Sequence, residues 1–168
     1  MLENFKTKTE GLNIRLVKEG EAGLVLSLIK AIAAYEKMSD CVVATEEGLN
    51  QALFVNHDCN ALIVEYEGKP IGFALFFHTF STFVGRTNLY LEDIFLYEEY
   101  RGKGFGKEIF RALNQVALEE GCQRFEWVCL NWNTPSINFY KAMGAFPMSD
   151  WTTWRMTRPE MEKVVKDE

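Results

Sequence analysis

The segment Arg101-Gly102-Lys103-Gly104-Phe105-Gly106 stands between a predicted strand and a predicted helix. Residues 88–97 before it are mostly apolar, and apolar residues recur at helical spacing over 109–117. Glycines let the backbone turn tightly and approach a ligand closely. The amino end of the following helix would present free N–H groups and a positive dipole end. The sequence therefore predicts a strand–loop–helix unit whose loop can bind a phosphate group.

Basic residues strengthen the phosphate prediction, because Arg101, Lys103 and Lys107 accompany the glycines. Two other phosphate motifs do not match. A P-loop requires Ser or Thr after its lysine, whereas Lys107 is followed by Glu108, and the upstream glycine is missing. A dinucleotide fingerprint has G-x-G-x-x-G in the first βα unit, whereas the spacing here is G-x-G-x-G and comes late. For the loop taken alone, a glycine-rich turn without a ligand is the alternative.

Hydrophobic periodicity assigns the other elements. Strands are expected at 12–17, 60–66, 71–83, 88–97, 124–130 and 151–157. Helices are expected at 24–35, from the capping residue Thr45, at 109–117 with Gly121 after it, and from Thr134-Pro135 to Gly144. The order β-α-α-β-β-β-α-β-α-β predicts a mixed sheet with helices on both faces. A chain of 168 residues without a low-complexity linker is expected to form a single domain, residues 1–168.

Composition excludes some classes of protein. The chain has 18 Lys+Arg against 24 Asp+Glu and a net charge of −6, so no nucleic-acid partner is expected. No apolar stretch approaches the length of a membrane span, and residues 1–11 contain no apolar signal segment. We therefore expect no membrane partner and a cytoplasmic location, with reduced thiols.

Soft metal ligands are few and scattered. They are Cys41, Cys59, Cys122, Cys129, His57 and His78. No two cysteines have C-x-x-C spacing, so no metal site is predicted. Cys122 and Cys129 lie near apolar runs, where a buried free thiol is the expected state.

The loop has a counterpart in a known family. The pattern Arg101-x-x-Gly104-x-Gly106 resembles the R/Q-x-x-G-x-G/A signature of the GNAT superfamily, whose loop binds the pyrophosphate of CoA. The runs LYLEDIFL at 89–96 and NWNTPSINFYK at 131–141 are similar, more narrowly, to the spermidine/spermine N-acetyltransferase subfamily, which includes thialysine acetyltransferases. Tyr35-Glu36 fits that subfamily as well.

The resemblance extends from Ile14 to Met156, with two departures from the subfamily pattern. Asn131 stands where an acidic residue is expected, and residues 149–153 lack the paired glutamates of some polyamine enzymes. Both departures weaken the polyamine assignment and leave the cofactor segment unchanged.

The resemblance implies an α/β (α+β) fold with a mixed, mostly antiparallel central sheet and helices on both faces. It implies an acetyl-CoA-dependent N-acetyltransferase that acts as a homodimer. The implied cofactor-binding residues are Ile94, Phe95, Leu96, Arg101, Gly102, Lys103, Gly104, Phe105, Gly106, Lys107, Asn133, Pro135 and Ser136.

The chemistry requires a base and an acid. An alkyl ammonium, with a pKa of about 10.4, must lose a proton before its amine attacks a thioester. Glu92 lies in an otherwise apolar strand, and because side chains in a strand alternate, Glu92 and Asp93 are expected to point to opposite faces. In the resembled subfamily, the position of Glu92 contacts the amine. Backbone N–H groups along 94–96 would stabilise the oxyanion. Tyr140 resembles the family's general acid. The alternatives are a salt-bridging role for Glu92 and a core role for Tyr140.

The acceptor is expected to be a small amine with several positive charges, such as a polyamine, a diamine or a thialysine-like amino acid. The implied substrate-binding residues are Tyr35, Glu36, Glu92, Glu126 and Trp127. For Glu126 and Trp127, an exposed strand charge and a core aromatic are the alternatives. Two other functions stay open: acetylation of a protein or amino-acid amine, and CoA binding without turnover.

Overall fold

The structure is a computed structural model that describes residues 4–166 of the chain. The described residues form two compact units, residues 4–128 and residues 129–166, and each unit is treated by itself. The larger unit contains all six described strands and three of the α-helices. None of the described helices combines the length and the hydrophobicity that crossing a membrane requires.

The larger unit has a regular order along the chain. Its strands are β1 (Asn4–Phe5), β2 (Leu12–Leu16), β3 (Asn60–Tyr66), β4 (Lys69–Ser81), β5 (Arg86–Leu96) and β6 (Phe125–Trp127). Its α-helices are α1 (Ala22–Tyr35), α2 (Glu46–Asn50) and α3 (Phe105–Glu119). Short 3₁₀ turns lie at Ser39–Cys41 and Glu98–Tyr100, and a π-helical turn at Gln51–Val55 follows α2.

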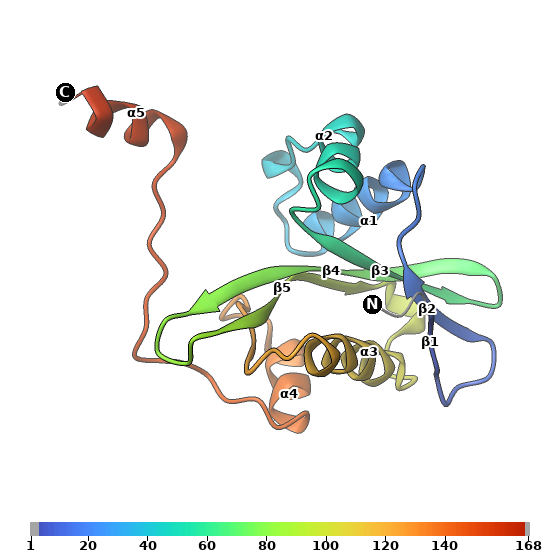
Figure 1. Ribbon diagram of the computed structural model, residues 1–168. Helices are drawn as coiled ribbons and strands as arrows, with labels where there is room; N and C mark the ends of the chain where they lie inside the picture. The colour runs from blue at the N-terminus through green and yellow to red at the C-terminus, as the bar shows by residue number, and fades with distance from the viewer. Residues whose placement is uncertain (1–3, 167–168) are drawn as a thin grey trace. The chain divides into compact units, whose positions relative to one another are not determined.

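The sheet follows the chain, because its spatial order is β1-β2-β3-β4-β5-β6. All neighbouring strands are antiparallel except β5 and β6, which are parallel and are joined through α3. Figure 1 shows α1 and α2 over one face of this sheet and α3 over the other. The predicted mixed, mostly antiparallel sheet with helices on both faces is thus confirmed.

The face under α1 holds one hydrophobic cluster. Val25, Leu28 and Ile32 project from α1 at helical spacing. The strands contribute residues that alternate along each strand, namely Ala61 and Ile63, Phe73 and Leu75, and Phe95. Tyr35 at the end of α1 packs against this cluster. The α1 face therefore carries a filled core up to the last turn of the helix.

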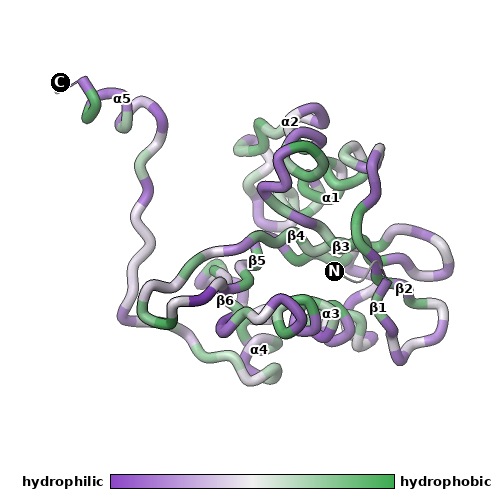
Figure 2. The backbone as a smooth tube through the Cα atoms, viewed as in Figure 1, coloured by the Kyte–Doolittle hydropathy of each residue, from purple (hydrophilic) through white to green (hydrophobic). Residues whose placement is uncertain are grey.

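The other face is covered by α3, whose hydrophobic and hydrophilic residues alternate along its turns in Figure 2. Phe105 contacts Tyr66 of β3, with ring centroids 5.1 Å apart. Phe110 contacts Phe125 and Trp127 of β6 at 5.5 and 5.3 Å. Helix α3 thus contacts both the central strand β3 and the edge strand β6, so the loop that precedes α3 ends at a fixed point.

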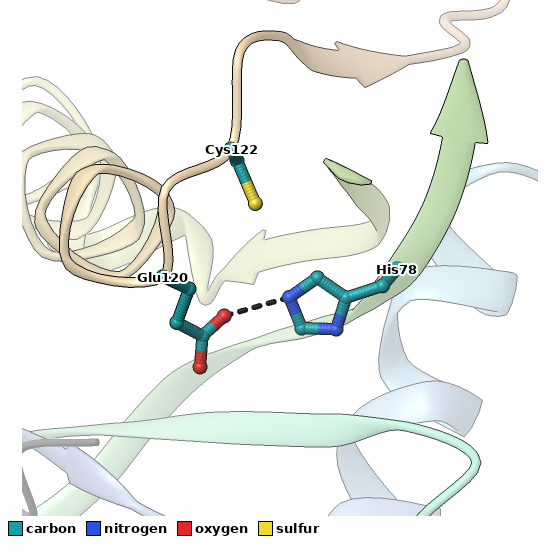
Figure 3. Close-up of side chains that lie close together, drawn as sticks. All are labelled: His78, Glu120 and Cys122. Atoms are coloured by element: carbon teal, nitrogen blue, oxygen red, sulfur yellow. Dashed lines mark hydrogen bonds and ion pairs between the residues drawn. The ribbon is translucent and has the colours of Figure 1, made fainter. Parts of the chain in front are cut away.

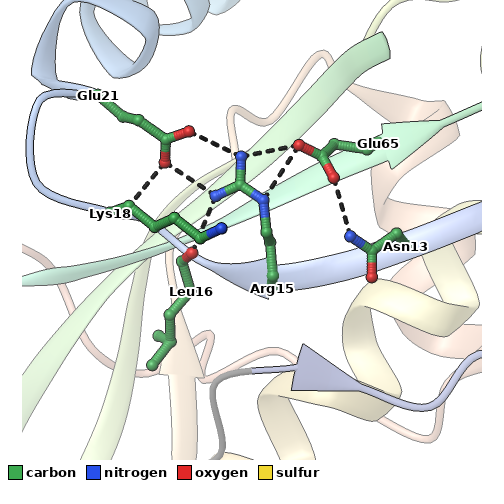
Figure 4. A network of polar contacts seen from close by, with 6 residues as sticks. All are labelled: Asn13, Arg15, Leu16, Lys18, Glu21 and Glu65. Atoms are coloured by element: carbon green, nitrogen blue, oxygen red, sulfur yellow. Dashed lines mark hydrogen bonds and ion pairs between the residues drawn. The ribbon is translucent and has the colours of Figure 1, made fainter. Parts of the chain in front are cut away.

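A buried arginine joins β2, β3 and the start of α1. The guanidinium of Arg15, whose side chain is only 9% exposed, donates to both carboxylate oxygens of Glu21 at 2.7 and 2.8 Å. It also donates to Glu65 Oε1 at 2.7 and 3.0 Å. Figure 4 shows Arg15 between the two carboxylates. This network fixes where α1 leaves the sheet, and hence where its far end lies.

The smaller unit contains two helices, α4 (Thr134–Ala142) and α5 (Arg158–Lys166). Asn133 caps α4, since its side chain accepts a hydrogen bond from the N–H of Ser136 at 3.4 Å, and Pro135 occupies the first turn. The described residues divide into two compact units. The single domain that we expected from the sequence therefore stays a prediction.

Several predicted elements differ from those observed. The strand expected at 151–157 is wrong, because these residues form no strand and Trp151 and Trp154 are 74% and 90% exposed. Strand propensity without a partner strand does not form a ladder. The strand expected at 124–130 is shortened to β6, which pairs with β5 over three residues. The sequence analysis did not predict β1 or α5.

Candidate active site

The glycine loop begins with a well-anchored arginine. Arg101 Nε donates to the carbonyl oxygen of Leu96, the last residue of β5, at 2.8 Å. The guanidinium carbon lies 4.4 Å from the ring centroid of Tyr35 and 5.6 Å from that of Phe95. These distances are typical of cation–π contacts. Arg101 therefore ties the loop to the end of β5 and to the last turn of α1.

The glycines that follow adopt a backbone that other residues avoid. Gly102 and Gly104 have φ of +71° and +84°, the left-handed region that a Cβ disfavours. Gly104 is the N-cap of α3 and provides no capping side chain. A Cβ at Gly104 would meet no atom within 4 Å. The helix therefore starts beside open space, as an anion site requires.

The charges around the loop are arranged for an anion. Lys103 and Lys107 are exposed, and Lys103 Nζ lies 5.3 Å from the ring centroid of Tyr100. Phe105 is buried and anchors the first turn, and Gly106 follows it in the helix. Arg101, by contrast, directs its guanidinium toward aromatic rings and a carbonyl. We infer that Lys103 and Lys107, with the backbone of α3, are the groups available to a phosphate.

The strand before the loop keeps an unpaired edge. Strand β5 pairs with β4 from Arg86 to Leu96, but its parallel pairing with β6 covers only Leu89–Leu91. Among the described strands, no partner pairs with the β6 side of Ile94, Phe95 or Leu96. Alternate backbone N–H groups of a strand point to each side. Donors suited to a carbonyl oxygen are thus available in the predicted segment.

An irregularity of β5 lies next to that edge. Leu75 pairs with Asp93 and the next residue, Phe76, pairs with Leu91. Glu92 is therefore an extra residue, and β5 contains a β-bulge there. The regular alternation that predicted opposite faces for Glu92 and Asp93 does not apply at a bulge. Glu92 itself is exposed.

The carboxyl group of Asp93 has an unusual environment. Burial, followed by the charges of Glu92 and Glu36, raises the pKa of Asp93 to about 6. Burial also raises the pKa of Glu36, the residue that ends α1. Three carboxyl groups from β5 and α1 thus act on one another, and among them Asp93 is held partly protonated near neutral pH.

A fourth carboxylate lies on the neighbouring strand. Glu126 of β6 pairs in register with Tyr90 of β5 and accepts a hydrogen bond from Asn88 Nδ2 at 3.4 Å. Burial and then the charges of Glu92 and Glu126 raise the pKa of the Tyr90 hydroxyl. Glu92 is therefore electrostatically coupled to Tyr90 as well as to Asp93. The bulge gathers negative charge from three elements of the larger unit.

The two predicted aromatic substrate contacts have other neighbours. Trp127 packs edge-to-face on Phe110 at 5.3 Å and contacts Phe125 at 4.9 Å, both on the α3 face. Tyr35 lies beneath the guanidinium of Arg101. These contacts favour a core role for Trp127 and a supporting role for Tyr35. Their contact with a substrate stays a prediction.

The smaller unit carries the remaining predicted residues. Asn133 is buried and Ser136 is half-buried at the start of α4, while Pro135 is exposed. Tyr140 is half-buried on the same helix, and its ring centroid lies 5.6 Å from that of Phe139. The geometry gives all four residues fixed positions within their unit, and their roles stay predictions.

Comparison with known proteins decides the family. The sequence profile of the acetyltransferase (GNAT) family matches residues 26–145. The chain belongs to the GNAT acetyltransferase family. Members of this family transfer an acetyl group from acetyl-CoA, so the chain is an acetyltransferase.

Curated relatives and solved structures agree with this family. This acetyltransferase is 38% identical over 160 residues to the thialysine N-epsilon-acetyltransferase of Sus scrofa, with 90% of the chain and 94% of the relative covered. Its identity to the Bos taurus enzyme of the same name is 39%, with the same coverage. The predicted subfamily, which includes thialysine acetyltransferases, is confirmed.

The fold has solved counterparts at lower identity. An integron cassette protein from the mobile metagenome of V. cholerae superposes with a TM-score of 0.78 at 23% identity, covering 94% of this acetyltransferase and 99% of that protein. This likeness concerns the fold alone.

Two residues beside Glu92 have environments that the sequence alone did not reveal. Asp93 entered the sequence analysis only as the neighbour of Glu92, and Tyr90 only as part of the run LYLEDIFL. Tyr90 and Asp93 are three positions apart, so in a regular strand their side chains would lie on opposite faces. They share a face only because one residue between them is extra. Glu92 is that extra residue.

Proposed function

We propose that this enzyme transfers an acetyl group from acetyl-CoA to a primary amine of a small polycationic acceptor, such as a polyamine, a diamine or a thialysine-like amino acid. One observation carries the proposal. Besides burial, the charges of Glu92 and Glu36 raise the pKa of Asp93, and those of Glu92 and Glu126 raise the pKa of Tyr90, so these carboxylates lie near one another. Such a set of carboxylates, with no cation recorded beside Glu92 or Asp93 among the described residues, is complementary to an amine with more than one charge.

The glycine loop would hold the cosubstrate. Lys103, Lys107 and the first N–H groups of α3 fit a pyrophosphate, because the space over Gly104 is open. The unpaired edge of β5 would direct backbone N–H groups at the thioester oxygen, where negative charge develops. The other contacts that we propose are those of Ile94, Phe95, Leu96, Arg101, Gly102, Phe105, Gly106, Asn133, Pro135 and Ser136.

Proton removal from the acceptor is assigned to the bulge. Glu92 is exposed and would accept the ammonium proton directly or through a water. Asp93 has a pKa near 6, which is better matched to neutral pH than that of an ordinary carboxyl. We therefore assign Glu92 as the base. We assign Asp93 as a carboxyl group that binds the ammonium group of the acceptor and influences the pKa of the neighbouring groups.

Departure of the thiolate needs a proton donor. Tyr140 occupies the position that the subfamily resemblance assigns to this acid, and its helix is fixed by the Asn133 cap. A phenol with a pKa of about 10 can donate to a thiolate of similar basicity. We propose Tyr140 as the general acid.

Recognition of the acceptor would rest on its distal charge. Glu36 caps the end of α1, which packs over the sheet, and Glu126 lies on β6 beside β5. Each would pair with an ammonium group of the acceptor. The names of the pig and cattle relatives, which specify a thialysine ε-amine, support an acceptor with two cationic groups. A monoamine would leave one carboxylate without its partner, which is costly in a half-buried site.

The test is a comparison of kcat/KM for a diamine and its monoamine of equal length, measured as thiol release from acetyl-CoA. We expect the diamine to be preferred at least tenfold. Glu36→Gln should reduce this preference mainly by raising KM for the diamine. Lys30→Gln, an exposed change on α1, is the matched control.

Other results would select another function. Equal kcat/KM for the two amines would reject a multivalent acceptor and favour a protein or amino-acid amine. Binding of acetyl-CoA without thiol release from any amine would favour a CoA-binding sensor.

We also propose a cytoplasmic homodimer. Cys41, Cys59 and Cys122 are free thiols, and Cys41 is exposed, as in a reducing compartment. The dimer rests on the subfamily resemblance, and light scattering after size exclusion at several concentrations tests it.

A further inference from the structure

A second group of reactive side chains lies on the α3 face, at the opposite end of α3 from the glycine loop. His78 of β4, Glu120 after α3 and Cys122 before β6 place their ligand atoms within 4.8 Å of one another. Figure 3 shows the imidazole, carboxylate and thiol converging. A helix of 15 residues separates this group from the loop by about 22 Å. None of the three is among the residues that we propose for acetyl transfer.

The backbone holds two of these residues rigidly. Helix α3 ends with Gly121 at φ +71°, and the N–H of Cys122 donates to the carbonyl oxygen of Ala117 at 2.8 Å. This is the hydrogen bond of a Schellman motif. Glu120 and Cys122 therefore flank a fixed turn, and their side chains do not depend on a flexible loop.

The third residue reaches the turn across the sheet. His78 pairs with Leu89 and shares the α3 face with Phe76 and Ala74, because side chains alternate along β4. His78 Nε2 lies 2.6 Å from Glu120 Oε2. The Cys122 side chain lies next to Thr87, with Sγ 4.0 Å from the hydroxyl. Strand β4 and the turn after α3 thus bring three different ligand types to one point.

Imidazole nitrogen, thiolate sulfur and carboxylate oxygen are the ligand types that zinc takes in proteins. A tetrahedral zinc ion separates neighbouring ligand atoms by roughly 3.3–3.6 Å. The observed spacings, from 2.6 Å to at most 4.8 Å, require side-chain movements of about 1 Å. The side chains of His78 and Glu120 are 35% and 26% exposed, so an ion and a fourth, water ligand have access.

We propose that His78, Glu120 and Cys122 form a binding site for a zinc ion. The ion would replace the thiol proton of Cys122, which passes to solvent. It would also replace the hydrogen bond between His78 and Glu120, and the imidazole would bind through Nε2 with its proton on Nδ1. The charges of one thiolate and one carboxylate balance the ion. Bound zinc would join β4, the end of α3 and the start of β6. The sequence predicted no metal site, because no two cysteines have C-x-x-C spacing and only His57 and His78 could join them, and His78 lies 44 positions before Cys122.

The experiment uses the full chain and zinc, with cobalt as a spectroscopic probe. Competition with a chromogenic chelator measures zinc affinity, and a sulfur-to-cobalt charge-transfer band reports the thiolate ligand. We expect one zinc per chain and a melting temperature that rises with zinc concentration to saturation. Cys122→Ser, His78→Gln and Glu120→Gln should each lower the affinity at least tenfold.

The control variant is Cys41→Ser, which removes an exposed thiol outside the cluster and should leave affinity unchanged. His78→Gln and Glu120→Gln alter partly exposed residues, so they remain informative if Cys122→Ser unfolds. A missing charge-transfer band, or equal loss in Cys41→Ser, would mean adventitious binding only and would overturn the proposal. Acetyl transfer is not the readout, so failure here leaves the proposed function intact.

Discussion

The guanidinium of Arg101 lies 4.4 Å over the ring of Tyr35, and its Nε donates to the carbonyl oxygen of Leu96. This pairing joins the first residue of the cosubstrate loop to the last residue of α1. Tyr35 immediately precedes Glu36, one of the carboxylates that we propose to bind the acceptor. The loop and the acceptor region of the larger unit therefore share one support.

Replacing Arg101 by lysine distinguishes the effect of its positive charge from that of its stacking on Tyr35. Arg101→Lys keeps the charge but loses the planar stack on Tyr35, a contact of order 1 kcal/mol. We expect KM for acetyl-CoA to rise about fivefold in steady-state kinetics. If the lysine variant has the wild-type KM, the positive charge alone accounts for the contribution of Arg101 to acetyl-CoA binding. Tyr35→Leu should produce a rise of similar size, because it removes the other half of the contact.

Replacing Gly104 tests the loop itself. Gly104→Val places a branched side chain at φ +84°, next to the helix N–H groups, and should abolish the rise in melting temperature that acetyl-CoA produces. Gly85→Val is the matched control, since Gly85 has φ +68° and equally open space but lies in the β4–β5 turn. Both variants should lose about 1–2 kcal/mol of stability from backbone strain. An undiminished acetyl-CoA shift in Gly104→Val would remove the loop from the site.

Replacing Tyr140 tests the acid. Tyr140→Phe keeps the ring contact with Phe139 and removes only the hydroxyl. We expect kcat to fall about 10²–10⁴-fold, the usual contribution of a general acid, with little change in acetyl-CoA affinity by calorimetry. Near-normal turnover, or a loss of thermal stability alone, would make Tyr140 a core aromatic.

Replacing Asp93 should stabilise the protein in a pH-dependent manner. The pKa of Asp93 in the folded state, about 6, exceeds its unfolded value. Above pH 6 this buried carboxyl is charged in the folded state, and its charge destabilises that state. Stability is therefore lost as pH rises from about 4 to 6. Asp93→Asn should gain about 2 kcal/mol at pH 8 and nothing at pH 3.5, measured by urea unfolding. It should also raise KM for the amine. A gain that does not vary with pH would contradict the assigned environment.

The Arg15 network makes the opposite pH prediction. Hydrogen bonding to Arg15 lowers the pKa of Glu21 and, against the effect of burial, that of Glu65. Their stabilisation is complete above the unfolded pKa of about 4.3 and is lost as pH falls through the lowered values. Arg15→Met should cost about 3 kcal/mol at pH 7 and much less at pH 3. Arg158→Gln, which breaks an exposed pair on α5, should cost under about 0.5 kcal/mol at either pH.

Local signals predicted the elements that depend on local physics. The helical spacing in α1, the Thr45 cap that accepts from Gly48, and the glycine start of α3 are properties of short segments. They appear in the structure as predicted. The short β1 and the absent strand at 151–157 depend on whether a partner strand exists, which no local pattern specifies. Helix α5 has a weak apolar spacing, at Met161, Val164 and Val165, among mostly charged residues.

The candidate site was predictable by residue type and not by arrangement. Glu92 and Arg101 were singled out from the sequence, and the structure places Glu92 at the bulge of β5 and Arg101 at the start of the glycine loop; their roles stay predictions. The side-chain direction of Arg101 toward Tyr35 and the pKa of Asp93 arise from contacts between elements distant in sequence. Likewise, His78 and Cys122 are 44 positions apart, so only the folded sheet brings them together.

The bulge on β5 has a consequence for insertions and deletions. If Glu92 were deleted, Leu91 opposite Phe76 and Asp93 opposite Leu75 would become consecutive rungs of a regular ladder. Every other side chain of β5 would keep its face, its partner and its burial. The sheet is therefore complete without this residue, and the fold gives no reason for its presence. Of the 11 residues in β5, Glu92 is therefore the one that could be lost at least cost to the ladder, and its retention would agree with the role that we propose for it.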